Sequence, residues 1–467
     1  MAAPKPPTNT PSATPNSLAA RDTRAVLHPY TNLRAHERTG PMVITKGQGV
    51  HVSDDEGHDY IEGMAGLWCC ALGFSESRLA AAAARQMGAL PFYHLFGGKS
   101  HPGAIELAER LIAMAPAPFA RVFFANSGSE AVDSAIKLCW YANNALGRPH
   151  KKKIIARKRA YHGVTIAAAS LTNLPVNQTA FDVPLAPMRQ TGCPHFYREG
   201  KTGESEAQFA ERLARELDEL ITAEGADTVA AMIAEPVMGA GGVIVPPAGY
   251  FDHIQPVLKK HGVWLIADEV ICGFGRTGNM FGCETYNIQP DMMVLAKALS
   301  AGYAPISALL ISDEIYQAIA DKSAEIGSFG HGFTYSAHPL PAAVALETLN
   351  IYQERDILAQ VRAVMPHFQA RLGALGDHPL VGEARGIGLI GAVELVADKA
   401  TKQPFDPALG AGARLALASQ QAGLIHRAMG DSLAFAPPLI ITAAEIDTMF
   451  DRFTEALSAV GPNLTVN

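Results

Sequence analysis

The sequence predicts an α/β fold, in which a large domain with a mostly parallel sheet covered by helices is joined to a smaller α+β domain. From Arg121 onward, short apolar runs alternate with amphipathic helical segments, a pattern typical of parallel sheets with helices on both faces. Two of the apolar runs, residues 263–267 and 292–296, have the length of buried strands. These runs are followed by Asp268 and Lys297, and a charge at the end of a buried strand is costly unless it is paired or used.

The composition of the chain limits the classes of protein to which it can belong. The chain has 467 residues, of which 48% are hydrophobic and 18% are charged, so it can form a large core and is not globally disordered. Its net charge of −7 gives no general reason to bind nucleic acid or an anionic membrane. No apolar run approaches the ~20 residues of a membrane span, and the N-terminus lacks the apolar region of a signal peptide. The six cysteines show no C-x-x-C spacing, so we expect reduced thiols in a cytoplasmic protein.

The order of the segments predicts how the domains are built. Residues 1–21 are dominated by Pro, Thr, Ser, Ala and Asn, which predicts a disordered lead-in. We assign residues 22–75 to the N-terminal part of the small domain and residues 76–345 to the large domain. Residues 346–467, with their short strands and helices, are assigned to the C-terminal part of the small domain. The chain shows no internal repeat.

Periodicity and turn signals predict the individual elements. A strand, a turn at 54–57 and a second strand are expected within residues 41–62. Helices are expected at 76–90, 103–114, 205–222, 250–261, 410–421 and 443–460, with a further long helix entered near 339. Strands are expected at 121–125, 153–157, 229–237, 263–267, 292–296, 389–395 and 433–437.

The two strand-end charges indicate a cofactor. Ligands of open α/β sheets bind at the carboxyl ends of strands, where Asp268 and Lys297 would emerge. A buried lysine is easily deprotonated and can form a Schiff base with a carbonyl. A nearby carboxylate could keep the ring nitrogen of pyridoxal phosphate protonated, which makes that ring an electron sink.

Two further segments follow predicted strands and suit the same cofactor. Ser127-Gly128-Ser129-Glu130 opens a helix, so its backbone N–H groups and hydroxyls could bind an anion; plain N-capping is the alternative. Tyr161 could stack on a cofactor ring, or be an ordinary core or surface aromatic.

Three other features are ambiguous when taken alone. Gly386, Gly388 and Gly391 spell G-x-G-x-x-G, but they precede a strand and no helix opens there, so we predict a tight turn or close packing. His331 and His338 lack a third ligand in pattern, so we expect no metal site. Arg427 is an ordinary arginine unless it faces a cleft, where its planar fork would suit a substrate carboxylate.

Taken together, the motifs resemble those of class III aminotransferases in the fold-type I pyridoxal-phosphate superfamily, most closely the ω-transaminases that act on amines or ω-amino acids with pyruvate. The matching pieces run in family order: N-S-G-S-E-A, Y-H-G, A-E-P-V-M-G-A-G-G, A-D-E-V-I-C-G-F-G-R-T-G, A-K-A-L-S-A-G-Y-A-P, G-F-T-Y-S-A-H-P and H-R-A-M-G-D. The A-D-E-V motif with a lysine 29 residues after its aspartate is highly specific. The resemblance covers about residues 25–460.

The resemblance implies roles for particular residues. Lys297 would hold the cofactor as a Schiff base and then move the substrate proton, while Asp268 would pair with the pyridinium nitrogen. Tyr161 and Val270 would contact the two faces of the ring, near His162. The phosphate would be held by Ser127, Gly128, Ser129 and, from the partner subunit of a homodimer, Thr334. The substrate pocket would be formed by Trp68, Tyr161, Phe96 of the partner chain, Ala240 and the mobile Arg427.

One difference from related enzymes bears on the substrate. Class III members acting on ornithine or 4-aminobutyrate carry a glutamate where this chain has Ala240, and in them that glutamate engages the arginine. Ala240 would leave Arg427 free for a keto acid, which favours transfer from a primary amine or ω-amino acid to pyruvate with ping-pong kinetics. An aminomutase, racemase or decarboxylase on the same scaffold is the alternative, as is a catalytically silent cofactor-binding protein. A dimer could also pair into a tetramer.

Overall fold

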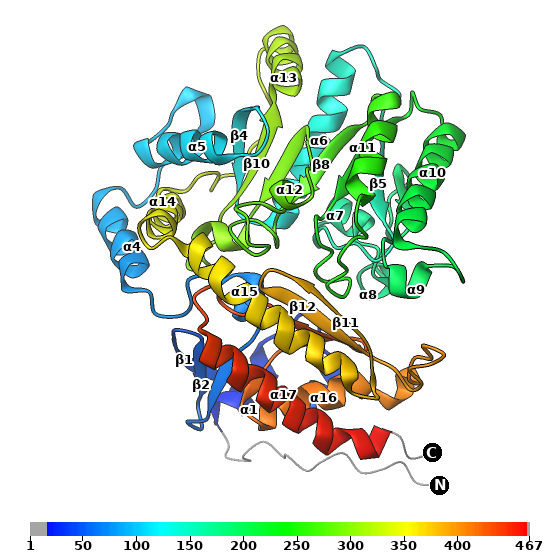
Figure 1. Ribbon diagram of the computed structural model, residues 1–467. Helices are drawn as coiled ribbons and strands as arrows, with labels where there is room; N and C mark the ends of the chain where they lie inside the picture. The colour runs from blue at the N-terminus through cyan, green and yellow to red at the C-terminus, as the bar shows by residue number, and fades with distance from the viewer. Residues whose placement is uncertain (1–15, 465–467) are drawn as a thin grey trace.

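The computed structural model describes residues 16–464 and has two parts, one above the other in Figure 1. The upper part contains a sheet of seven strands with helices on both faces, and the lower part contains two sheets of four strands with helices packed against them. The first and the last described segments, α1 (Leu18–Ala25) and α17 (Ala443–Leu464), both lie in the lower part (Figure 1). The α/β fold class and the smaller α+β part formed by N- and C-terminal segments are confirmed.

The large sheet is mostly parallel, as predicted. β10 runs antiparallel to both of its neighbours, and the other neighbouring strands of the sheet are parallel. Its strands, in spatial order, are β4 (Phe119–Ala125), β10 (Ser307–Ser312), β9 (Met292–Leu295), β8 (Trp264–Asp268), β7 (Val229–Ala234), β5 (Lys153–Arg157) and β6 (Met188–Thr191).

Helices cover both faces of this sheet because successive side chains of each strand point to opposite sides. In β8, Trp264 and Ile266 face one core, whereas Leu265 and Ala267 face the other. The first core includes α6 (Gly128–Ala145), α7 (Ile166–Leu171) and α13 (Asp313–Ile326). The second includes α5 (Pro102–Met114), α10 (Glu206–Glu224), α11 (Tyr250–Lys260) and α14 (Pro339–Glu354), and α4 (Ser77–Ala89) packs on α14.

The lower part brings N-terminal and C-terminal segments of the chain together, because β3 and β13 pair in parallel. One sheet has the order β1 (Ile44–Gln48), β2 (His51–Asp54), β3 (Asp59–Glu62) and β13 (Leu424–Ile425). The other has the order β11 (Val381–Ile387), β12 (Ile390–Leu395), β15 (Ser432–Phe435) and β14 (Arg427–Met429). The longer helices of the lower part are α15 (Ile357–Ala374), α16 (Ala411–Gln421) and α17 (Ala443–Leu464). The upper part contains the short helices α8 (Pro175–Gln178), α9 (Phe196–Glu199) and α12 (Gly282–Thr285) (Figure 1), and a further short helix is α3 (Ala65–Trp68).

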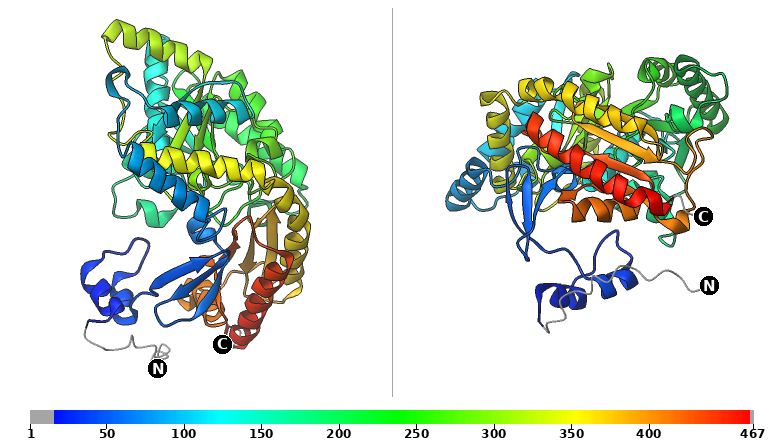
Figure 2. Two further views of the ribbon diagram at one scale, coloured as in Figure 1. Left: turned by 90° about the vertical axis from the view of Figure 1, so that its left-hand side faces the viewer. Right: turned by 60° about the horizontal axis from the view of Figure 1, so that its bottom comes forward.

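The N-terminal segment differs from the prediction. α1 (Leu18–Ala25) begins inside the predicted lead-in, because the Ser17 side chain caps it by accepting from Ala20 N. α2 (Leu33–Thr39) follows, and both helices lie at the edge of the lower part (Figure 2). The rest of the predicted lead-in, residues 1–15, lies outside the described residues. The domain boundaries themselves stay a prediction.

Some details of the sheets also differ. Residues 41–62 form three strands rather than two, while β6 and β10 were not predicted. The Gly-rich pattern is a tight turn, as expected: Gly388 links β11 to β12 with φ +58°, and a Cβ there would lie 2.4 Å from the Arg276 carbonyl oxygen. Across residues 16–464, no helix has the combination of length and apolar character that a membrane crossing requires.

Candidate active site

The carboxyl ends of five strands of the large sheet meet at one edge, because β4, β5, β7, β8 and β9 all run in the same direction. The residues that follow or end these strands include Ser127, Tyr161, Glu235, Asp268 and Lys297. All five line one cavity of about 390 Å³. The structure therefore brings together the side chains that the sequence placed at separate strand ends.

Asp268 presents a buried carboxylate to this cavity. Its side chain lies at the end of β8, where only 4% of the residue is exposed. Its Oδ2 lies 2.7 Å from His162 Nδ1, which donates to it, and its Oδ1 accepts from Val270 N at 3.1 Å. These bonds orient the carboxylate. The other ring nitrogen of the histidine, Nε2, is buried and has no partner within residues 16–464.

Lys297 lines the same cavity from the first position of a short 3-10 helix (Lys297–Ser300) that follows β9. Burial lowers the pKa of its ammonium group, although Cys69 and Asp268 partly oppose that effect. The lysine has φ +46°, an uncommon conformation for a residue with a side chain. In the part of the chain that the structure describes, its Nζ makes no hydrogen bond. The arrangement favours an unprotonated, nucleophilic amine.

The N-terminus of α6 forms a polar cradle at the cavity wall. Ser127 Oγ caps the helix by accepting from Glu130 N at 3.2 Å, and Ser129 Oγ accepts from Val164 N at 3.0 Å. Both hydroxyls can therefore still donate. Within residues 16–464, the backbone N–H groups of Gly128 and Ser129 have no acceptor, as is usual in a first helical turn. These donors and the helix dipole suit a phosphate.

A glycine keeps this cradle open. Gly163 has φ +128°, and a Cβ there would lie 2.5 Å from Ser129 Oγ. Any side chain at this position would displace the serine hydroxyl from its place.

Arg427 and three aromatic residues lie together beside the cavity, whose lining includes Tyr161. The Arg427 guanidinium carbon is 5.1 Å from the Trp68 ring centroid and 5.9 Å from that of Tyr30. The Tyr30 hydroxyl lies 3.4 Å from that of Tyr161, so we call Tyr30, Trp68 and Tyr161 the aromatic wall. Burial lowers the pKa of Arg427 and raises that of Tyr161. Among the described residues, no carboxylate forms an ion pair with Arg427.

Three residues predicted for the site belong neither to the cavity lining nor to the group formed by Arg427 and the aromatic wall. Phe96 is half-exposed and Thr334 is exposed, and neither lines the cavity. They belong to neighbouring segments, since a Cβ at Gly332 would lie 3.4 Å from the Phe96 ring. Ala240 is buried in the loop after β7 and does not line the cavity either.

The sequence analysis did not identify some residues of the site. Glu235 accepts hydrogen bonds from Tyr161 N at 3.2 Å and from Gly239 N at 2.9 Å, and burial raises its pKa. It follows the buried strand β7, so the strand-end rule that identified Asp268 also applied to it. Cys69 lines the cavity, and burial raises the pKa of its thiol. Tyr30 is 131 residues from Tyr161, and no local pattern relates the two.

The donor set of the cavity fits pyridoxal phosphate. A lysine with a lowered pKa suits the aldehyde carbon, a buried carboxylate suits a protonated ring nitrogen, and the cradle of α6 suits the phosphate. The three groups have different chemistry and line one cavity.

Comparison with known proteins agrees with this fit. A profile for "Aminotransferase class-III" matches residues 33–457. The chain is 48% identical over 448 residues to "Gamma aminobutyrate transaminase 3, chloroplastic" of Solanum lycopersicum, covering 95% of this chain and 86% of that protein. It is 48% identical over 435 residues to "Gamma-aminobutyrate transaminase 1, mitochondrial" of Oryza sativa subsp. indica, covering 93% of this chain and 84% of that protein.

Solved structures extend the similarity to the whole fold. The omega transaminase of Pseudomonas jessenii in complex with PMP superposes with a TM-score of 0.95 at 54% identity, covering 96% of this chain and 99% of that one. A thermostable 6-fold mutant from the same organism has the same TM-score and identity, covering 96% and 100%. The chain belongs to the class III aminotransferase family and is a pyridoxal-phosphate-dependent aminotransferase of fold type I.

Proposed function

We propose that the enzyme moves an amino group from a primary amine or ω-amino acid to pyruvate in two alternating half-reactions. The observation that carries this proposal is Arg427, a cation beside the aromatic wall that has no carboxylate partner among the described residues. Its guanidinium suits the carboxylate of a keto acid. The wall suits the apolar body of an amine, so one pocket can accept both substrates in turn.

Each residue near the reaction has a distinct task in this proposal. Pyridoxal phosphate supplies the electron sink that makes the substrate C–H proton removable. Lys297 anchors the cofactor, and its amine takes up that proton and returns it. Asp268 stabilises the positive charge of the ring nitrogen, and His162 fixes the orientation of the carboxylate. Tyr161 and Val270 confine the ring from its two faces.

The phosphate cradle and part of the pocket involve a second subunit in this proposal. Ser127, Gly128 and Ser129 bind the phosphate within one chain, whereas Thr334 reaches the phosphate of the partner subunit. Phe96 likewise contributes to the partner's substrate pocket. The exposure of both residues and their neighbouring positions support a homodimer with shared sites. Light scattering on the holoenzyme is expected to give at least a dimer, and a monomer would contradict this part.

The names of the relatives bear on the class of amino donor, and Ala240 bears on the acceptor. The compared proteins are named as gamma-aminobutyrate transaminases and omega transaminases, so both ω-amino acids and amines are candidate donors. A small residue at position 240 provides no carboxylate to occupy Arg427, which supports pyruvate as the acceptor.

A half-reaction experiment tests the proposal. Holoenzyme is mixed with β-alanine, 4-aminobutyrate, putrescine or an aryl-alkyl amine, without acceptor, and the released carbonyl is measured. One carbonyl per active site is expected from a true donor, followed by one alanine after pyruvate is added. An aminomutase, racemase or decarboxylase would not give this sequence. Parallel double-reciprocal plots are expected, and a higher kcat/KM for 2-oxoglutarate than for pyruvate would contradict the acceptor.

We also propose that the enzyme works in the cytoplasm. The six cysteines are free thiols, which suits a reducing compartment. The plant relatives are named as chloroplastic or mitochondrial, so subcellular fractionation is the direct test, and recovery in an organelle would contradict this assignment.

A further inference from the structure

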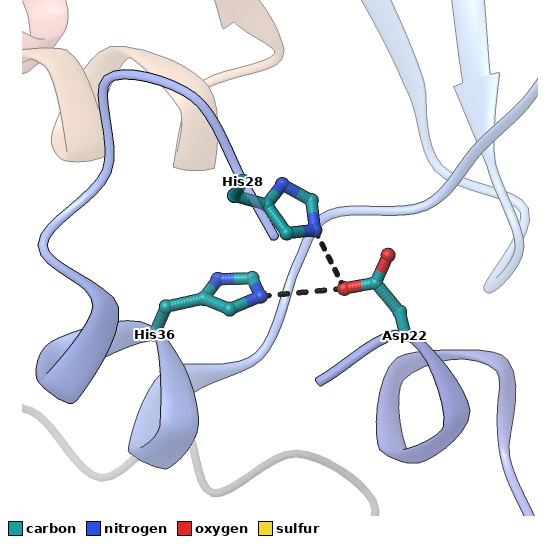
Figure 3. A group of neighbouring side chains, drawn as sticks. All are labelled: Asp22, His28 and His36. Atoms are coloured by element: carbon teal, nitrogen blue, oxygen red, sulfur yellow. Dashed lines mark hydrogen bonds and ion pairs between the residues drawn. The ribbon is translucent and has the colours of Figure 1, made fainter. Parts of the chain in front are cut away.

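Asp22, His28 and His36 form a compact cluster in the N-terminal segment, away from the cavity. Figure 3 shows the three side chains pointing toward one another from α1, the following loop and α2. Asp22 Oδ1 lies 2.7 Å from His28 Nε2 and 3.3 Å from His36 Nε2. The two imidazole rings are in contact, with centroids 4.2 Å apart. Two ring nitrogens thus converge on a single carboxylate oxygen.

The spacing of these three atoms can become that of a tetrahedral metal site through small side-chain movements. Bonds of ~2.0–2.1 Å from zinc to nitrogen and oxygen place neighbouring ligand atoms ~3.3 Å apart. The His36–Asp22 distance already has this value, and the ligand atoms of all three residues lie within 4.8 Å of one another. The shorter His28–Asp22 contact must lengthen by ~0.6 Å, and the two histidine nitrogens, which lie within 4.8 Å of each other, must approach by at most ~1.5 Å.

The protonation of the rings permits metal binding. Within residues 16–464, the Nδ1 atoms of His28 and His36 have no hydrogen-bond partner, so each can carry the ring proton while Nε2 binds an ion. Asp22 Oδ2 also accepts no hydrogen bond from the described residues. Two neutral imidazoles and one carboxylate give a site of charge −1, which suits a divalent ion.

A second cluster of metal-ligating side chains is already neutralised. His195, Glu383 and Glu394 also lie close together, but their carboxylates form ion pairs with Arg385 and Arg198. A cation there would have to displace two arginines. In the described structure, no lysine or arginine forms an ion pair with Asp22.

We propose that Asp22, His28 and His36 bind one divalent transition-metal ion of the zinc class, with water completing its coordination. The ion would join α1, the loop and α2 into one unit. His28 is two residues before Tyr30, whose hydroxyl accepts from Asn177 Nδ2 at 2.5 Å and lies beside Tyr161. Metal binding would therefore fasten the segment that supplies one side of the aromatic wall.

Zinc titration of the holoenzyme tests the site. Isothermal calorimetry and metal analysis after dialysis are expected to show one tight Zn²⁺ per chain. Asp22→Asn, His28→Asn and His36→Asn are each expected to weaken that binding at least ~10-fold. His150→Asn, which alters an exposed histidine elsewhere, is the matched control and is expected to bind as the wild type does. Equal zinc affinity in the wild type and the three variants would overturn the proposal.

Limited proteolysis tests whether the bound ion holds α1, the following loop and α2 together. Arg24 is an exposed trypsin site in α1, so zinc is expected to slow cleavage after it several-fold in the wild type. The double variant His28→Asn/His36→Asn is expected to be cleaved at one rate with or without zinc. Wild-type cleavage that zinc does not slow would contradict the fastening role.

Discussion

Two groups of buried charges in this protein are arranged in opposite ways. In the active-site cavity, His162 Nε2 is buried without a hydrogen-bond partner among the described residues, and Lys297 Nζ forms no hydrogen bond or ion pair with them. In the lower part, Arg385 donates to Glu383 at 2.5 Å and to Glu394 at 2.9 Å. Arg198 donates to Glu394 at 2.5 Å, and His195 lies 2.8 Å from Glu383. We call these last five residues the Arg385 network.

The pKa values show what this difference means. Burial alone would raise the pKa values of Glu383 and Glu394, yet the neighbouring arginines and His195 hold both below the ordinary value. In the cavity, burial prevails, raising the pKa of Glu235 and lowering that of Lys297. Paired charges keep their ordinary ionisation and serve structure. Lys297, whose burial is not offset by a paired charge, has a lowered pKa and is available for chemistry.

The Arg385 network also joins the two parts of the molecule. Arg385 Nε donates to the carbonyl oxygen of Gly242 at 3.0 Å and to that of Val243 at 3.1 Å, in the loop after β7. The same guanidinium contacts Ser432 Oγ on β15 at 3.2 Å. Removing it would leave Glu383 with His195 alone and Glu394 with Arg198 and the more distant His195, and it would take this donor from the Gly242 and Val243 carbonyl oxygens.

Lys297→Ala is expected to have the largest effect, and on activity alone. Turnover should fall at least ~10³-fold, because the proton carrier is lost, and the visible absorbance of the lysine-bound cofactor should disappear. The melting temperature of the apoenzyme should change little. Lys260→Ala, at an exposed lysine, is the control. Retained turnover in the Lys297→Ala variant would contradict the role of this lysine.

Arg385→Leu is expected to act on stability instead. Breaking a buried ion pair should lower the free energy of unfolding by ~3–5 kcal/mol, measured by urea denaturation. The folded variant should keep the cofactor absorbance. Arg34→Ala, which breaks an exposed ion pair with Glu37, should leave stability unchanged. Wild-type stability in the Arg385→Leu enzyme would show that the pairing is not structural.

Arg427→Gln is expected to separate the two substrates. Loss of a charged hydrogen bond of ~1.5–3 kcal/mol should raise the Michaelis constant for pyruvate ~10- to 100-fold, while that for an uncharged amine should change less than ~3-fold. Steady-state kinetics with both substrates varied gives the answer. Equal changes for both would show that Arg427 does not bind the carboxylate.

His426 is expected to show the smallest effect, as a third kind of buried group that is neutral and whose ring nitrogens have no hydrogen-bond partner within residues 16–464. It packs between Phe435 and Phe453, and burial lowers its pKa to about 3. The unfolded chain, with an ordinary pKa of ~6.5, therefore binds a proton that the folded chain does not. Stability should fall as the pH drops below ~6.5, by ~2 kcal/mol at pH 5. In urea denaturation, His426→Leu should therefore reduce the loss of stability between pH 7 and pH 5 by ~2 kcal/mol. An unchanged pH dependence would contradict this.

Much of the upper part could be predicted because its signals are local. A fully buried parallel strand is an apolar run, and Val229–Ala234, Trp264–Asp268 and Met292–Leu295 were found as such. β10, with a serine at each end, was not found. Its place in the sheet depends on antiparallel pairing with β4 and β9, which lie in other segments of the sequence.

The sequence by itself determined the α/β class, the charges at the strand ends and the capped start of α6, because each follows from side-chain character over a few residues. Only the tertiary structure decided that Tyr30 lies beside Arg427 and that Asp22 meets two histidines. It also decided that Arg385 is paired while Lys297 is not. Contacts of this kind join separate segments of the chain, so no local pattern encodes them. Their energies depend on which partners the fold leaves within reach.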